Sequence, residues 1–114
     1  MSRRASGFRA WALQRFTAIY LGLFSILLLG VFMFAPPPDF DTWRAWAADP
    51  VISVLSLLFL LALLLHAWVG IRDVIIDYVW HSGARLTLLS LFAVGIAMTG
   101  IWAARVLLLA AIGE

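Results

Sequence analysis

Long apolar runs alternate with short polar stretches along the chain, and this pattern predicts three membrane-spanning helices. The apolar runs cover residues 14–35, 51–71 and 86–111. Each reaches the ~20 residues that a helix needs to cross a bilayer. Three consecutive prolines end the first run, because proline donates no backbone hydrogen bond and restrains the residue before it. We therefore predict an all-α integral membrane protein, with residues 1–114 forming a single membrane-anchor domain.

The two connections between these runs differ in character. The first is polar and carries Trp43 and Trp46, whose spacing of three is typical of an amphipathic turn at the level of the lipid headgroups. The second, predicted over residues 72–85, is short and of mixed charge, and Gly83 is its expected turn.

Arginine placement predicts the orientation in the membrane. Four arginines precede the first span, one lies in the first loop and two in the second (Arg3, Arg4, Arg9 and Arg15; Arg44; Arg72 and Arg85). Positive charge favours the cytoplasmic side, so we expect a cytoplasmic N-terminus and a periplasmic C-terminus. Arg105, towards the far end of the third span, counts against this orientation but is outweighed.

Composition excludes several classes of protein. Hydrophobic residues make up 65% of the 114 residues, which leaves too little polar surface for a water-soluble globule. The absence of cysteine excludes disulfides, thiolate metal sites and an iron–sulfur cluster held by this chain. The net charge of +2 is carried by arginine and indicates topology, not nucleic-acid binding. The first run is long enough to span, so we expect a retained helix instead of a cleaved signal peptide.

Small residues occur in the first and third spans and favour close contact between helices. They have two interpretations: packing within this chain, or a face that receives another subunit. The residues are Gly22, Ser25 and Gly30 in the first span, and Gly95, Thr99 and Gly100 in the third.

His66 is the only ionisable side chain in the second span. An ionisable group in the membrane is costly and needs a partner, and neutral imidazole is the commonest protein ligand for a metal. His66 lies five residues before Ile71, or ~8 Å inside the cytoplasmic boundary. Arg15 begins the first span from the same side. An imidazole for iron and a guanidinium for propionates suit a haem, although Arg15 also fits an interfacial anchor.

A second axial ligand from this chain is not expected. His81 lies fifteen residues beyond His66, or ~22 Å along a continuous helix, whereas two axial nitrogens must face one iron. Met33 and Met98 lie substantially deeper than His66. We therefore expect the second ligand to come from another polypeptide.

Asp77 and Tyr78 follow His66 by about three helical turns, so Asp77 shares its face if the helix continues. A tyrosine hydroxyl can donate a hydrogen bond to a quinone carbonyl, and a carboxylate beside it can relay protons. The alternatives are an interfacial aromatic for Tyr78 and a solvated helix-end charge for Asp77.

The run HAWVGIRDVIIDY, from His66 to Tyr78, resembles the H-A-W-x-G…D-Y signature of the small hydrophobic membrane anchor of bacterial succinate dehydrogenase, or complex II. The run RFTAIYL, from Arg15 to Leu21, resembles the R-x-T-A-I start of that family's first helix. The resemblance covers nearly the whole chain. One departure is Trp80-His81, where the family has lysine-proline, which leaves the role of His81 open between the quinone mouth and a solvated loop.

This resemblance implies a set of roles. His66 would be an axial ligand of haem b, with the other axial histidine from the cytochrome b556 subunit, and Arg15 would lie near the propionates. Tyr78 would hydrogen-bond ubiquinone near the iron–sulfur subunit, supported by Asp77. A flavoprotein subunit would oxidise succinate, so this chain would hold no catalytic residue and would not be an enzyme alone. The implied location is the lipid bilayer of the bacterial inner membrane, in the tricarboxylic acid cycle and aerobic respiration.

Two alternatives remain at this point. One is the anchor of a fumarate reductase, in which the haem can be absent and the electron flow reversed. The other is a structural or accessory three-span protein without haem, in which His66 is a buried hydrogen-bonded residue. The combination of His66, Asp77 and Tyr78 favours the haem and quinone anchor, since a packing helix has no need of all three.

Overall fold

A computed structural model describes residues 3–113, with side chains described from Gly7 onward. Within these residues the chain is helical and contains no strand. The helices are α1 (Arg3–Phe34), α2 (Phe40–Ala48), α3 (Pro50–Tyr78) and α4 (Ser82–Ala111). α1, α3 and α4 are each long and apolar enough to cross a membrane. The predicted all-α architecture with three candidate spans is therefore confirmed.

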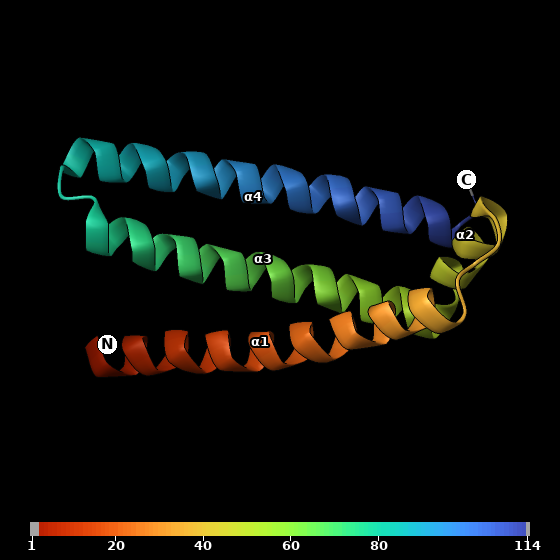
Figure 1. The fold of residues 1–114 in the computed structure, drawn as a ribbon. Coiled ribbons are helices and arrows are strands. Elements are labelled where there is room, and N and C mark those ends of the chain that lie inside the picture. The colour runs from red at the N-terminus through yellow and green to blue at the C-terminus, as the bar shows by residue number, and fades with distance from the viewer. Residues whose placement is uncertain (1–2, 114) are drawn as a thin grey trace.

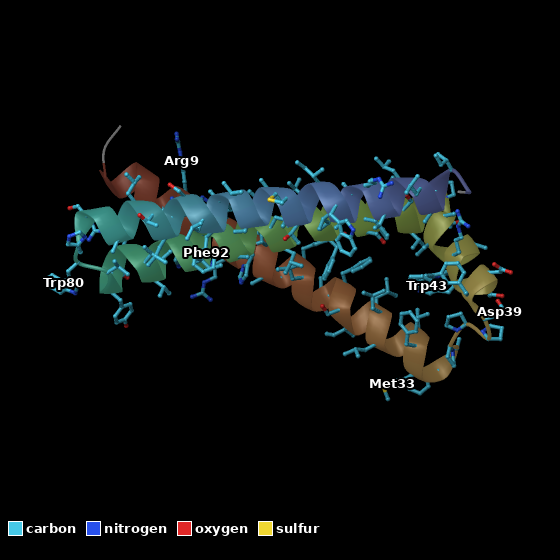
Figure 2. The ribbon with its side chains drawn as sticks, turned by 90° about the horizontal axis from the view of Figure 1, so that it is seen from above. Arg9, Met33, Asp39, Trp43, Trp80 and Phe92 are labelled. Carbon is cyan, nitrogen blue, oxygen red and sulfur yellow. The ribbon has the colours of Figure 1, made fainter. Side chains whose placement is uncertain are left out.

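The three long helices form an open row with α3 in the middle (Figure 1). α3 packs against both α1 and α4, whereas α1 and α4 do not pack against each other over the described residues. The α3–α4 connection lies at the same end of the row as the start of α1, and we call this the His81 end. α2 and the end of α4 lie at the opposite end, the Pro36 end. Figure 2 shows Trp80 at the first end and Asp39 and Trp43 at the second.

Helix ends at the Pro36 end follow from local sequence. α1 ends at Phe34, just before the three prolines, as predicted. The Asp39 side chain caps α2 by accepting a hydrogen bond from the Thr42 backbone amide at 2.7 Å. Hydrogen bonds from Thr42 hold the pKa of this exposed carboxyl below its ordinary value. Asp49 caps α3 by accepting from the amides of Val51 and Ile52, and Pro50 occupies the first turn, where no amide is needed.

At the His81 end the helices extend beyond the predicted spans. α3 continues to Tyr78 and α4 begins at Ser82, so the predicted connection over 72–85 is wrong and only residues 79–81 connect the two helices. Gly83 is likewise not in a connecting turn but in the first turn of α4. A helix can continue into water after it leaves the hydrocarbon, and charged residues are compatible with it there. The fall in hydropathy after Ile71 therefore marks the membrane boundary and not the end of α3.

His81 explains why the connection is so short. Its Nδ1 accepts a hydrogen bond from the Ala84 backbone amide at 3.1 Å and caps α4. A Cβ at Gly83 would lie 3.0 Å from the His81 Cε1 atom, so glycine leaves room for the ring. His81 is therefore an exposed helix cap, not a second ligand placed near His66.

Arg85 fixes the end of α3 from the first turn of α4. Its guanidinium donates to the Val79 carbonyl at 3.0 and 3.1 Å and to the Ile76 carbonyl at 3.3 Å. These are carbonyls that the last turn of a helix leaves without intrahelical donors. The contact orders the turn of α3 that carries Asp77 and Tyr78.

Only one of the candidate glycines makes a close contact between helices of this chain. Gly100 is buried, and a Cβ built there would lie 2.6 Å from Leu64 Cδ1 on α3. A Cβ at Gly22, Gly30 or Gly95 would meet nothing within 4 Å. Packing within the chain therefore accounts for Gly100, and the other three glycines face open space.

Replacing Gly100 by alanine is expected to weaken the α3–α4 contact. The added methyl group must displace Leu64, and overpacking of this kind costs about 1–3 kcal/mol. Gly95→Ala is the matched control on the same helix, because its methyl group enters open space and alanine favours a helix over glycine. Thermal unfolding of detergent-solubilised protein should rank Gly100→Ala below both wild type and Gly95→Ala. Equal midpoints for the two variants would contradict the close contact.

Candidate functional site

His66 lies near the middle of α3, half-buried against α1. Its Nδ1 is 3.0 Å from the hydroxyl Oγ1 of Thr17, and this hydrogen bond links two residues that are 49 positions apart. The other ring nitrogen, Nε2, makes no hydrogen bond to the side chains or backbone of the described residues. The partner of His66 within this chain is thus a hydroxyl, and one ring nitrogen is left available.

Thr17 is the only buried polar side chain among the described residues, with 7% of its surface exposed. Its Oγ1 lies 2.7 Å from the Leu13 carbonyl and 3.2 Å from the Gln14 carbonyl, both in the preceding turn of α1. Backbone carbonyls and the imidazole therefore surround this hydroxyl. The arrangement fixes Thr17, and through it the position of the His66 ring.

A second polar group lies one turn from the first pair. The Gln14 side-chain amide lies beside Gly70, four residues after His66, where a Cβ would lie 3.5 Å from its Nε2, an ordinary van der Waals distance. Gln14 Oε1 is buried and has no hydrogen-bond partner among the described residues. Buried acceptors are normally satisfied, so this oxygen calls for a donor from water or another chain.

The sequence pattern alone assigned no role to Gln14 or Thr17. The signal was their spacing: Gln14, Thr17 and Tyr20 recur every three residues and so share one face of α1. That face meets α3 throughout, since the Tyr20 hydroxyl donates to the Leu55 carbonyl at 2.7 Å. A polar stripe in an apolar helix marks the face that packs on protein.

Arg15 lies at the depth of His66 but not beside it. It is two residues from Thr17, and therefore about 200° around the helix from the side chain that contacts His66. Its side chain is exposed, and its guanidinium carbon lies 5.5 Å from the centre of the Trp11 ring. Arg15 thus points away from the imidazole, and its guanidinium is accessible to an anionic group.

Asp77 and Tyr78 are exposed at the His81 end of α3. The helix is continuous from His66 to Tyr78, so Asp77 shares the His66 face as predicted, at a separation of ~17 Å along the axis. Neither side chain forms a hydrogen bond or ion pair within the described part of the chain. The nearby Arg72–Asp73 ion pair, 3.1 Å long and exposed, marks the region where α3 leaves the hydrocarbon.

The donor set suits one side of a haem. No group of three histidine or acidic side chains that could hold a metal ion occurs in the described residues. His81 caps α4, and Met98 and Met33 are exposed on other helices, with Met33 at the Pro36 end of α1 (Figure 2). A single imidazole with a free ring nitrogen could supply one ligand to a haem iron.

Comparison with known proteins identifies the family of this chain. Residues 1–102 match the family described as succinate dehydrogenase/fumarate reductase transmembrane subunit. A succinate dehydrogenase hydrophobic membrane anchor subunit of Coxiella burnetii is 28% identical over 109 residues, covering 96% of this chain and 93% of that protein. Its counterpart from Rickettsia conorii is 34% identical over 85 residues, covering 74% and 68%. The chain therefore belongs to the succinate dehydrogenase/fumarate reductase transmembrane subunit family, as a multi-pass membrane anchor subunit.

Proposed function

We propose that this chain holds one side of a haem b and forms part of the quinone-reduction site of a succinate:quinone oxidoreductase. The cytochrome b556 subunit supplies the other axial ligand. Electrons that the flavoprotein subunit takes from succinate reach the quinone through the iron–sulfur subunit. As a single membrane-anchor domain with no catalytic residue for succinate oxidation, the chain acts only within this complex.

The observation that supports this proposal is the state of His66. Its Nδ1 is held by Thr17 and its Nε2 has no partner in the described residues. His66 is half-buried, and its Nε2 is not enclosed by other residues of the described chain. His66 therefore keeps one nitrogen for a ligand, and Arg15 carries positive charge at the same depth for the haem propionates. A bound haem would accept and return single electrons.

Asp77 and Tyr78 suit the quinone end of the site. Reduction of ubiquinone consumes two electrons and two protons, so the site needs a hydrogen-bond donor to the carbonyl oxygen and access to protons. The exposed Tyr78 hydroxyl supplies the donor, and the exposed Asp77 carboxylate exchanges protons with water. Arg85 holds the end of α3 that presents both.

The direction of reaction is proposed from the relatives. The family includes fumarate reductase subunits, but both relatives described above are succinate dehydrogenase subunits, which favours succinate oxidation. Both come from bacteria, and the arginine distribution favours a cytoplasmic N-terminus and a periplasmic C-terminus. We therefore assign the chain to the bacterial inner membrane, with the His81 end facing the cytoplasm and the iron–sulfur subunit.

Purification of the tagged chain from its native membrane tests the proposal. The expected preparation contains flavoprotein, iron–sulfur and cytochrome b556 subunits, reduces ubiquinone with succinate, and shows a haem b band in its dithionite-reduced spectrum. Mass spectrometry and difference spectroscopy measure these properties. A complete four-subunit complex with no haem b band would contradict the haem assignment while leaving the anchor role intact.

A further inference from the structure

We infer that Thr17 is a positioning residue that selects the tautomer of His66, placing the ring proton on Nδ1 and leaving the Nε2 lone pair for a metal. This inference deepens the proposed function and rests on it. It assigns a role to a residue of α1, whereas the ligand itself is on α3.

The Thr17 hydroxyl has a single proton to share among its neighbours, together with two acceptor lone pairs. Three acceptors or potential acceptors surround it: the Leu13 carbonyl at 2.7 Å, the Gln14 carbonyl at 3.2 Å and His66 Nδ1 at 3.0 Å. The carbonyls can only accept, so they compete for the hydroxyl proton, and the shortest contact is to Leu13. His66 Nδ1 is the only one of the three that can also donate.

The lowest-energy assignment therefore has Thr17 donating to Leu13 and accepting from Nδ1–H. The reverse assignment would leave the Leu13 contact without a proton and would put the ring proton on Nε2, where it blocks metal binding. Burial of Thr17 excludes a water that might otherwise compensate. The Leu13 carbonyl on α1 thus determines, through the Thr17 hydroxyl, which ring nitrogen of His66 on α3 is free.

The same hydrogen bond tunes the ligand. A histidine ligand that donates its second N–H becomes more basic, and such outer contacts typically change metal affinity or activity by about 10–100-fold when removed. A more basic axial ligand donates more charge to iron and stabilises the oxidised state. Loss of the Thr17 hydroxyl should therefore raise the haem reduction potential and loosen haem retention.

Thr17→Val tests the inference, because valine keeps the shape of threonine and removes the hydroxyl. In the purified four-subunit complex we expect a higher haem midpoint potential and an altered electron paramagnetic resonance signal of the oxidised haem. Haem loss during detergent washing should become roughly tenfold faster. Thr17→Ser retains the hydroxyl and should preserve the wild-type potential and resonance signal. It also keeps the test decisive if the valine variant does not assemble, since a serine variant shifted in both properties would show that Thr17 acts by packing.

Thr87→Val is the matched control. Thr87 makes the same kind of bond to the carbonyl four residues earlier, from its Oγ1 to Gly83 at 2.8 Å, but among the described residues it makes no hydrogen bond to a histidine. Thr87→Val should leave the haem midpoint potential and the electron paramagnetic resonance signal unchanged. A Thr17→Val complex with wild-type potential, resonance signal and haem retention would overturn the inference. If wild type itself lacks haem b, the proposed function fails instead, so the two failures are distinguishable.

Discussion

Replacement of His66 by alanine is expected to remove the native haem b spectrum from the assembled complex. Alanine leaves Thr17 without its partner and the iron without one axial nitrogen. Changes that only touch a ligand from outside already cost about 10–100-fold in metal affinity, so loss of the ligand itself should cost at least as much. The reduced-minus-oxidised spectrum and the haem content per flavoprotein subunit measure the effect.

The other histidine of the chain provides the control. His81 caps α4 through Nδ1 and is exposed, so His81→Ala should leave the haem spectrum unchanged. A His66→Ala complex with an unaltered spectrum and full haem content would contradict the ligand assignment. Equal loss of haem from both variants would also contradict it, since that result would indicate a general failure of assembly.

Tyr78→Phe is expected to lower succinate:quinone reductase activity by about two- to tenfold. Removal of one hydroxyl that bonds a quinone carbonyl costs ~0.5–1.5 kcal/mol, and about 1.36 kcal/mol corresponds to a factor of ten in rate. Succinate oxidation with an artificial acceptor should remain close to wild type, because Tyr78 lies at the exposed end of α3 and supports no buried packing. The ratio of the two activities is the informative quantity.

Tyr20→Phe is the natural comparison, because the chain has only two tyrosines. The Tyr20 hydroxyl bonds the Leu55 carbonyl between α1 and α3, so its loss removes an internal contact and no contact to quinone. We expect an unchanged activity ratio in this variant. An equal fall of both activities in Tyr78→Phe would point to a structural effect and against a local role in quinone reduction.

The three spans could be predicted from sequence because hydropathy reports directly on burial in lipid. The end of α1 could also be predicted, from the three prolines that follow it. The end of α3 could not, since the helix continues through Arg72, Asp73 and Asp77. His81 could not be recognised as a cap, because capping is expected of serine, threonine, aspartate or asparagine. Gly83, two residues later, avoids a tight contact with its ring, since a Cβ there would lie 3.0 Å from Cε1.

Sequence alone could propose His66 as a candidate ligand, but it could not predict the hydrogen bond between His66 and Thr17. His66 stands out as the lone ionisable residue in an apolar run. This property can be read from the local sequence without knowledge of tertiary contacts. Thr17 is an ordinary residue for an apolar helix, and its role depends on α1 and α3 packing so that residues 49 positions apart meet. Arg15 lies at the same depth as His66, as expected. The rotation of α1, however, turns the Arg15 side chain away from His66.

Because the helices form an open row, copies of this subunit without partners should be less stable than copies in the complex. Lipid tails are as apolar as leucine, so α1 and α4 gain little from burying against α3 alone. Partner subunits that bind the folded row stabilise it by mass action, in proportion to the logarithm of their free concentration. Copies made in excess of the partners lack that contribution and keep Gln14 Oε1 without a protein donor. Proteolysis of those copies would keep the amount of this subunit close to that of its partners.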